Sequence, residues 1–450
     1  MNINSDTIVA ISTGSSSGAI SIVRMSGAKS TEIADKIFKA YSGQKPSEFE
    51  PRYLTLGNIS TENFNEQAMC VVFKAPKSYT GEDLVEFQCH GGTQIANGIM
   101  KECIKHGSRI ATNGEFTKRA FLNGKMTLSS AEGMMDMINA ESDAEIRAGY
   151  ELLTGNLSKL AYSSQEELTD ILSEIEVSFD YPEEIIEYIT KAKVKERLLA
   201  LSTQMEDTIN TSETGKMIKS GINVLIVGRP NVGKSSLLNN LLQKEKAIVT
   251  DIAGTTRDTV EGTFLLDDIK INLIDTAGIH DTQDTVEKIG VDKAKNLISQ
   301  ADIVLFLVDS NREYSNDDEE IYNSIQNTKF IVLRTKSDLE EKNQKHFKDE
   351  IEISIKNNNG ISELKERILK LTKISNLSSG SVIITNERHK NALIRSNEAI
   401  KRAIENIELD SLDLIAIDIK QAYIDIGEIT GNTTSEEIID SIFSKFCLGK

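Results

Sequence analysis

The sequence feature that most constrains the fold is Gly228-Arg-Pro-Asn-Val-Gly-Lys-Ser235, which has the form GxxxxGK[ST]. The short apolar run before it, 222–227, is rich in β-branched residues and predicts a buried strand. The residues after it, 236–242, place leucines at helical spacing. In a strand, glycine loop and helix of this kind, backbone N–H groups cradle phosphates at the helix N-terminus. The stretch therefore predicts a P-loop domain; a chance glycine turn is disfavoured by the motifs downstream.

Two side chains of this loop have specific expected roles. Lys234 would contact the β- and γ-phosphates of a nucleotide, and the Ser235 hydroxyl would bind Mg²⁺. The nucleotide contacts that we predict here are Asn231, Val232, Gly233, Lys234, Ser235 and Ser236.

Length and composition bound the remaining possibilities. The 450 residues suffice for about three domains, and 39% hydrophobic with 27% charged residues is typical of a soluble globular protein. The net charge of −18 argues against a non-specific nucleic-acid binder, although it leaves room for a local basic patch. The four cysteines form no CxxC pair, which indicates neither a disulfide framework nor a zinc site. With short apolar runs and no evident signal peptide, we expect a cytosolic protein without a membrane span.

The N-terminal region, residues 1–118, alternates in the manner of strands and predicts a small α+β domain. Expected strands are 7–11, 19–23, 69–73 and 83–90, with helices near 30–40 and 93–106. In the last strand Glu86, Gln88 and His90 share one face beside a double glycine. These three polar groups could line a pocket, or they could belong to a solvated sheet face.

The rest of the chain divides by its hydrophobic period. Residues 119–215 are helical, residues 216–374 alternate strand and helix as in a doubly wound parallel sheet, and residues 375–450 are helical again. We therefore expect a discontinuous helical domain with a P-loop domain inserted into it. Near the end, 434–437 reads as a capping box. The apolar stripe expected after it is Ile438, Ile439, Ile442, Phe443 and Phe446.

Two further motifs surround the expected γ-phosphate position. Residues 269–278 form a strand ending in DTAG, which places Asp275 near the Mg²⁺ shell and the Gly278 N–H near the γ-phosphate. The segment 250–258 lies where a GTPase keeps the threonine that caps Mg²⁺, and we assign that role to Thr256. The predicted contacts are Thr250, Asp251, Ile252, Ala253, Gly254, Thr255, Thr256, Asp275, Thr276, Ala277 and Gly278.

A near match to NKxD predicts guanine as the base. The Asp338 carboxylate can accept from guanine N1 and N2 together, and the stem of Lys336 would cover the base. Thr335 replaces the usual asparagine, so we expect one amide contact to be lost. The segment 353–356 lies where the last guanine-binding loop belongs, and it departs from the Ser-Ala pair that is usual there. The predicted base contacts are Thr335, Lys336, Ser337, Asp338, Ser354, Ile355 and Lys356. This set favours a GTPase over an ATPase.

The position after DTAG lacks the glutamine that orients the attacking water in many small GTPases. Ile279 stands there and can neither donate nor accept a hydrogen bond. Another residue or a partner must therefore hold the water, and no arginine finger is evident from the sequence.

Taken together, these residues resemble the MnmE (TrmE) family of tRNA-modification GTPases. The likeness runs from end to end. It includes the segments 6–10, 23–27, 79–83, 90–92, 114–125 and 250–258, and the final Phe446-Cys-Leu-Gly-Lys450, which is close to the family's CIGK ending.

The resemblance implies an N-terminal domain that binds a 5-formyl- or 5,10-methylene-tetrahydrofolate and holds a homodimer together. The positions matching the family's folate contacts are Arg24, Glu86, Lys125 and Lys450. It also implies a partner, the FAD-dependent MnmG (GidA), forming a heterotetramer. Together they would add an aminomethyl or carboxymethylaminomethyl group to carbon 5 of the wobble uridine of certain tRNAs.

For the nucleotide site the resemblance implies a potassium ion and a catalytic glutamate. Asn231, Thr250, Ile252 and Thr255 match the potassium ligands, the isoleucine through its carbonyl, and Glu287 matches the glutamate. Without the resemblance Glu287 would be an exposed acid at a helix start. Cys447 could be a small buried residue of the apolar stripe, and its chemical role stays open.

Two other classes of function remain at this stage. The chain could be a ribosome-assembly or regulatory P-loop GTPase, or a folate-binding subunit whose GTPase acts as a structural clamp. The Arg24, Glu86, Lys125 and Lys450 set disfavours the first, because a ribosome factor needs no folate pocket. The second is harder to exclude from sequence.

Overall fold

The computed structural model describes residues 6–14, 18–180, 191–244, 260–275, 297–372, 382–408 and 412–449. The chain divides into two compact units, one of residues 1–135, 153–173 and 423–450, and one of residues 136–152 and 174–422. Along the described residues, none of the helices is both long and apolar enough to cross a membrane.

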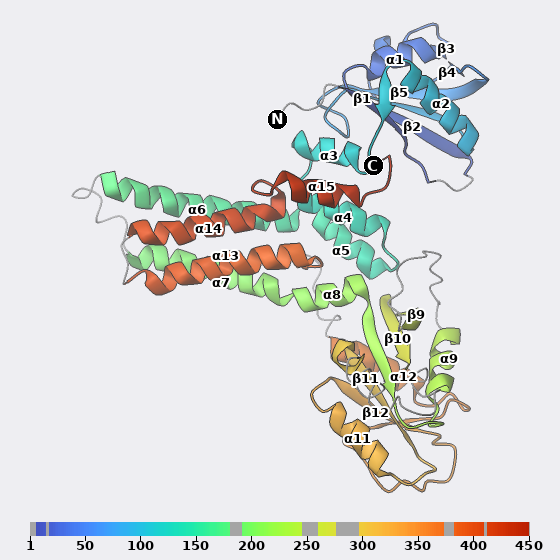
Figure 1. The fold of residues 1–450 in the computed structure, drawn as a ribbon, viewed down its shortest axis with the longest axis vertical. Coiled ribbons are helices and arrows are strands. Elements are labelled where there is room, and N and C mark those ends of the chain that lie inside the picture. Colours follow the sequence, from blue (N-terminus) through green and yellow to red (C-terminus); the bar gives the residue numbers. More distant parts are fainter. Residues whose placement is uncertain are drawn as a thin grey trace, which may run out of the picture. The chain divides into compact units, whose positions relative to one another are not determined.

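The N-terminal part of the first unit is a mixed sheet covered by helices (Figure 1). Its strands follow the spatial order β3-β4-β5-β6-β2-β1-β7, antiparallel except for β1 with β7. The elements are β1 (Thr7–Ile11), β2 (Ile20–Ser26), α1 (Ser30–Ile37), β3 (Phe38–Ala40), η1 (Pro46–Glu48), β4 (Thr55–Ser60), β5 (Asn65–Phe73), β6 (Leu84–His90), α2 (Thr93–Lys105) and β7 (Ser108–Ile110).

One face of this sheet is apolar and supplies the core. Val85 and Phe87 alternate with polar residues along β6, and they pack in one cluster with Ile33 of α1 and Ile99 of α2. The period-2 alternation thus leaves Glu86 on the opposite face. This confirms the predicted α+β fold of the N-terminal region.

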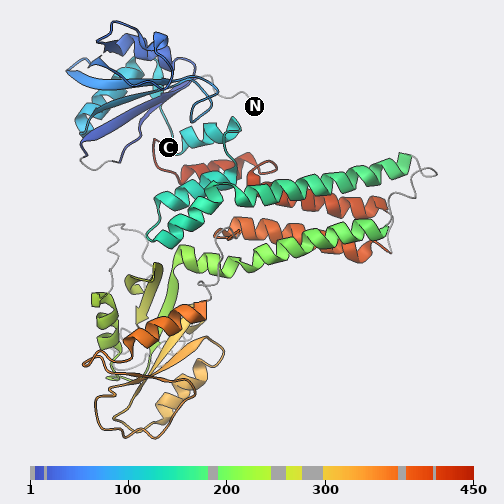
Figure 2. The same cartoon turned by 180° about the vertical axis from the view of Figure 1, so that it is seen from behind.

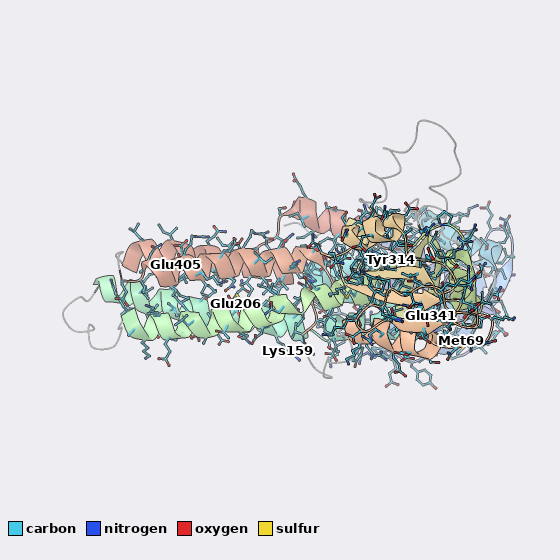
Figure 3. All side chains as sticks on the ribbon, turned by 90° about the horizontal axis from the view of Figure 1, so that it is seen from below. Met69, Lys159, Glu206, Tyr314, Glu341 and Glu405 are labelled. Carbon is cyan, nitrogen blue, oxygen red and sulfur yellow. The ribbon has the colours of Figure 1, made fainter. Side chains whose placement is uncertain are left out.

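Helices follow the sheet in the chain. Their bounds are α3 (Glu115–Leu122), α4 (Leu128–Ile138), α5 (Asp143–Leu153), α6 (Asn156–Asp180), α7 (Lys191–Asn210), α8 (Ser212–Ser220), α13 (Glu387–Asn406), α14 (Leu412–Thr430) and α15 (Glu436–Ser444). Helix α6 is described as far as Asp180, and the break expected at Tyr181-Pro182 lies outside the described residues. Helices α7 and α13 pack side by side, and Figure 3 labels Glu206 and Glu405 on them.

Two expectations for the last helix are wrong. The N-cap of α15 is Ser435, not Thr434, and it makes no side-chain capping bond. The Thr434 hydroxyl instead donates to the carbonyl of Glu428 at 3.1 Å, near the end of α14. The apolar stripe is also narrower than expected, because Ile438 is 43% exposed. Its other members pack against α3 and α4, with Phe443 6.0 Å from Phe121 between ring centroids.

The second unit contains a six-stranded sheet of order β13-β12-β11-β8-β10-β9, parallel apart from the antiparallel edge strand β9. Its elements are β8 (Ile222–Val227), α9 (Lys234–Lys244), β9 (Val260–Leu266), β10 (Ile269–Asp275), β11 (Ile303–Asp309), α11 (Asn316–Ser324), β12 (Phe330–Thr335), β13 (Ile351–Ile353) and α12 (Ile361–Thr372).

Both faces of this sheet are buried, which explains the near-continuous apolar strands. Val224 of β8 faces a cluster with Leu237 of α9 and Leu364 of α12. Its neighbour Leu225 faces the other cluster, which includes Ile325 just after α11. Figure 2 shows α12 as the orange helix lying across the lower sheet. The predicted doubly wound sheet is confirmed.

Candidate functional site

The P-loop connects β8 to α9 through residues in the left-handed backbone region. Gly228, Asn231 and Gly233 have φ of 152°, 67° and 106°. A Cβ on Gly228 would lie 2.6 Å from the carbonyl oxygen of Leu307, so only glycine lets the loop pass strand β11. A Cβ on Gly233 would meet nothing within 4 Å. The space beside Gly233 is therefore open, which leaves room for a bound phosphate chain.

Lys234 begins α9 and is held over the loop. Its side chain is buried, and Nζ donates to the carbonyls of Gly228 at 2.7 Å and Arg229 at 3.0 Å. Ser235 and Ser236 are exposed beside it in the first turn of α9. An ammonium group and a helix N-terminus at one place make the site electropositive, as phosphate binding requires.

Thr335 ends β12 and is tied to the P-loop. Its buried hydroxyl donates to the carbonyl of Val232 at 2.7 Å, and a second carbonyl, that of Val308, lies 3.3 Å away. We expected the replacement of asparagine to remove one side-chain amide contact. The structure shows instead that the threonine hydroxyl joins the base-reading strand to the phosphate loop.

Lys336 makes a second connection to the P-loop. Its backbone φ is 58°, and Nζ donates to the carbonyl of Asn231 at 3.0 Å and to Asp309 Oδ2 at 2.6 Å. Asp309 is buried at the end of β11, so its carboxylate holds the ammonium group of Lys336 in place. Because its ammonium group is held at both contacts, the aliphatic stem of Lys336 forms a surface on which a base can lie.

Asp338 is exposed and oriented by Ser354. The Ser354 hydroxyl donates to Asp338 Oδ1 at 2.7 Å, and this hydrogen bond lowers the pKa of Asp338. The Ser337 N–H donates to the carbonyl of Ile353 at 3.3 Å. Ser354, Ile355 and Lys356 form the turn after β13, closed by a bridge from Ser354 to Asn359. An ionised, oriented carboxylate is the acceptor that guanine N1 and N2 need.

Several predicted residues lie outside the described part of the chain. They are Thr250, Asp251, Ile252, Ala253, Gly254, Thr255, Thr256, Thr276, Ala277, Gly278, Ile279, Glu287 and Lys450. The backbone of Asp275 is described and ends β10, as expected for a DTAG strand.

A second set of candidate residues lies on the N-terminal sheet. Arg24 of β2 is directly opposite Glu86 of β6, and its Nε donates to Glu86 Oε1 at 2.7 Å. The guanidinium carbon is 5.4 Å from the ring centroid of Tyr79 and 5.8 Å from that of Phe116. Both charged side chains are largely buried, with 21% and 12% of their side-chain surface exposed. They form a fixed charged pair against two aromatic rings.

In the part of the chain that the structure describes, Gln88 and His90, the other two polar residues on that face of β6, form no hydrogen bond or ion pair with the Arg24–Glu86 pair. His90 is exposed at the strand end, and its Nδ1 lies 2.6 Å from Glu66. Gln88 lies between them and is half-buried. Thus the face is part ion-pair site and part solvated surface.

Lys125 lies next to the loop that carries Tyr79. Its Nζ donates to the carbonyl of Pro76 at 3.0 Å, and a Cβ on Gly81 would be 3.4 Å from its Cδ. Asn123 fixes the same loop by donating to the carbonyl of Thr80 at 2.7 Å. Arg24 and Lys125 therefore flank one loop, residues 79–81, from two elements far apart in sequence.

The C-terminal tail reaches the same sheet. The Ser12 hydroxyl donates to the carbonyl of Gly449 at 3.0 Å, where Gly449 has a φ of 90° and a Cβ would be 2.2 Å from the Ile11 carbonyl oxygen. Ile11 ends β1, whose residue Ala10 pairs with Arg24. Cys447 in this tail is an exposed free thiol, so it is not the buried residue of the apolar stripe.

A buried ionic network holds α3 against the sheet. Arg119 donates to Asp6 Oδ1 and Glu115 Oε1, both at 2.9 Å, and to Glu82 Oε1 at 3.2 Å. Burial alone would raise the pKa of Glu115, but hydrogen bonds from Arg109, the Thr112 N–H and Arg119 lower it to about 2. The network fixes the helix that carries Phe116 beneath Arg24.

Comparisons with known proteins show the family to which the chain is related. The family description "GTP-binding protein TrmE N-terminus" matches residues 7–125, and "MnmE helical domain" matches residues 128–447. A protein of Clostridioides difficile (strain 630) called "tRNA modification GTPase MnmE" is 41% identical over 455 residues, covering 99% of both chains. Proteins of the same name from Alkaliphilus metalliredigens (strain QYMF) and Alkaliphilus oremlandii (strain OhILAs) are 38% and 39% identical, each also over 99% of both chains.

The chain belongs to the MnmE family of tRNA modification GTPases.

For this MnmE-family chain, sequence reasoning missed two residues of the nucleotide domain. Asp309 orients Lys336, and Arg229 of the P-loop lies 3.3 Å from Asp318 at the start of α11. A charged residue that ends a wholly apolar strand, as Asp309 does, is a signal that could have identified the first. The Arg229–Asp318 pair joins two separate loops, for which the sequence carries no local sign. The sequence predicts Ser354 as a base contact, but not its hydrogen bond to Asp338.

Proposed function

We propose that this chain hydrolyses GTP in the modification of tRNA wobble uridines, working with an MnmG (GidA) partner. The pair would add an aminomethyl or carboxymethylaminomethyl group to carbon 5, with a tetrahydrofolate derivative as one-carbon donor. Membership of the MnmE family supports the GTPase and tRNA part. The observation that carries the folate part is the Arg24–Glu86 pair beside Tyr79 and Phe116.

The residues around this pair suit a folate. The half-buried ring of Tyr79 offers an apolar surface, and the buried ring of Phe116 supports Arg24 from the protein side. Arg24 and Lys125 supply cations for the folate's carboxylates. The Glu86 carboxylate can accept from the donor edge of a pterin. Lys450, which follows the docked Gly449, would complete the set. A folate-type ligand would carry the carbon unit, and these side chains would bind and orient it. We also propose that the N-terminal domain pairs two chains in a homodimer.

In the nucleotide site, Asp338 and Lys336 would select guanine, and the P-loop with Lys234 would hold the phosphates. Ser235 and Thr256 would hold Mg²⁺, which neutralises charge on the β- and γ-phosphate oxygens. Asn231, Thr250, Ile252 and Thr255 would hold K⁺, a further positive charge beside the phosphates. The exposed position of Asn231 at the loop tip suits that role. Glu287 would orient the attacking water, since Ile279 cannot.

Two measurements test this function. Wobble uridines from cells lacking the protein should lose the modification by mass analysis, and the wild-type gene should restore it. Arg24→Ala should weaken binding of 5-formyl-tetrahydrofolate at least tenfold while leaving GTP hydrolysis within twofold of wild type. Unchanged wobble uridines in the deletion would favour a regulatory or ribosome-assembly role instead. Loss of hydrolysis without loss of folate binding would refute the site assignment.

A further inference from the structure

A cavity of about 300 Å³ opens between helix α8 and the start of helix α13. It lies within the second unit and is separate from both candidate sites described above. Its polar lining consists mainly of Ser212, Lys216, Lys219, Asn386, Glu387 and Lys390.

Positive charge predominates in this lining. Lys216 and Lys219 are three residues apart on α8 and so share a face of the helix, while Lys390 lies in the first turn of α13. Lys219 is neutralised by Asp136, at 2.8 Å. Among the described residues, no carboxylate lies within ion-pair distance of the Lys216 or Lys390 ammonium group. The Lys216 and Lys390 side chains therefore line one cavity together with a single carboxylate, Glu387.

The helices around the cavity are basic although the chain is acidic. Residues 212–220 and 387–390, which border the cavity, together carry four lysines and arginines against two acidic residues, whereas the whole chain carries 51 against 69. A polyanion approaching this protein meets less repulsion here than over the chain as a whole. The N-terminal end of α13, a helix of 20 residues, adds its partial positive charge to the same place.

We propose that this cavity is a docking site for the phosphodiester backbone of the tRNA substrate, with Lys216 and Lys390 as its phosphate contacts. The inference rests on the proposed function in tRNA modification and deepens it, because it indicates how an acidic protein holds a polyanion. Lysine ammonium groups bind phosphate as point charges without reading sequence. The site would therefore position tRNA in general and leave the choice of tRNA to other contacts.

The test compares two double variants of the full-length protein. Lys216→Glu with Lys390→Glu reverses the charge of the site. Lys159→Glu with Lys370→Glu makes the same change at exposed lysines on α6 and α12 and is the matched control (Figure 3 labels Lys159). Binding of unmodified tRNA is measured by fluorescence anisotropy from 50 to 200 mM KCl. Lys216→Ala with Lys390→Ala repeats the test without new carboxylates.

We expect the site variant to weaken tRNA binding at least tenfold at the lowest salt, and the control to weaken it less than threefold. The slope of log Kd against log salt should fall by about 1 to 2 in the alanine variant, since each lost phosphate contact removes about 0.9. GTP hydrolysis and the melting temperature should match wild type in all variants. Equal losses in the site and control variants would refute the site, as would wild-type protein that binds no tRNA.

Two further measurements distinguish tRNA docking from partner docking and from the binding of a single phosphate ion. A variant that loses binding of the purified MnmG partner but keeps tRNA affinity would show a protein-docking surface and overturn the proposal. Inorganic phosphate at 10 mM should leave tRNA binding nearly unchanged at constant ionic strength, because a single phosphate cannot match the polyanion. If wobble uridines are modified in cells but the site variant binds tRNA like wild type, the docking site fails while the proposed function stands.

Discussion

The hydroxyl of Thr335 donates to the carbonyl of Val232 at 2.7 Å, which joins the strand that reads the base to the loop that holds the phosphates. The two residues are 103 positions apart in the sequence. Lys336 makes a second bond of this kind to the Asn231 carbonyl, so two hydrogen bonds connect the base site to the phosphate site. A nucleotide that contacts both sites can then bind without the entropy cost of ordering the two loops, which is the physical basis of the first prediction.

Thr335→Val should weaken GDP binding about fivefold. The change keeps the volume but leaves the buried Val232 carbonyl without this donor, at a cost of about 1 kcal/mol. Thr335→Ser and Thr335→Asn, which can restore the donor, should bind like wild type or better. Titration of a fluorescent GDP analogue measures this, and a valine variant with unchanged affinity would show that the bond is incidental.

Asp338→Asn should abolish the preference for guanine, because its amide N–H₂ would face the N–H donors of the base. Ser354→Ala should have a smaller effect in the same direction, since it removes the hydrogen bond that orients the carboxylate. Competition of GTP, XTP and ATP for the site distinguishes the two variants. Retention of full GTP affinity in Asp338→Asn would exclude Asp338 as the base-reading residue.

Gly449→Ala should detach the C-terminal tail. Its φ of 90° is strained for alanine, and the new Cβ would lie 2.2 Å from the Ile11 carbonyl oxygen. We expect loss of tRNA modification with GTP binding intact, as in a variant truncated before Cys447. Ser441→Ala, an exposed change on α15, is the control. Modification at the wild-type level in both the alanine and the truncated proteins would remove the tail from the mechanism.

Acid should loosen the contact between α3 and the N-terminal sheet. The pKa of Glu115 falls from its ordinary 4.5 to about 2, and the pKa of Asp6 is also lowered by hydrogen bonds from Arg109 and Arg119 against an opposing effect of burial. The stability that the two carboxylates contribute is therefore complete above about pH 4.5 and is lost as the pH falls toward 2, with an upper limit of about 3 kcal/mol for Glu115. Thermal melts between pH 6 and 3 should fall less steeply for Glu115→Gln. Parallel curves for the two proteins would contradict this.

Hydrolysis should depend on potassium and on Glu287. With Ile279 unable to hold water, K⁺ beside Asn231 would add positive charge near the developing phosphoryl charge, and sodium would fit a potassium-sized site poorly. GTP turnover and pairing of nucleotide domains should both be higher in KCl than in NaCl. Asn231→Ala should lessen the difference, and Glu287→Ala should stop turnover with GTP still bound. Equal turnover in the two salts would refute the cation mechanism.

The strand, loop and helix of the P-loop, the DTAG strand and the helical regions could all be predicted from sequence. They follow from hydrophobic period and glycine placement, which act between near neighbours. Two errors lie at the start of α15, where the residue pattern did not identify the true partner of one side chain or the exposed side of the helix. Thr434 reads as an N-cap, but its hydroxyl bonds the Glu428 carbonyl instead, and Ile438 fits an apolar stripe but lies on its exposed side.

The sequence by itself determined the fold class, the order of the motifs and the chemistry that each motif can perform, because those depend on residue type and spacing. Only the tertiary structure decided which groups act together. It placed Asp309 against Lys336, Ser354 against Asp338 and Gly449 against Ser12, and it brought Lys216 and Lys390 into the lining of one cavity. Each of these contacts joins separate elements, so it depends on how packed helices and strands meet, which no local pattern records.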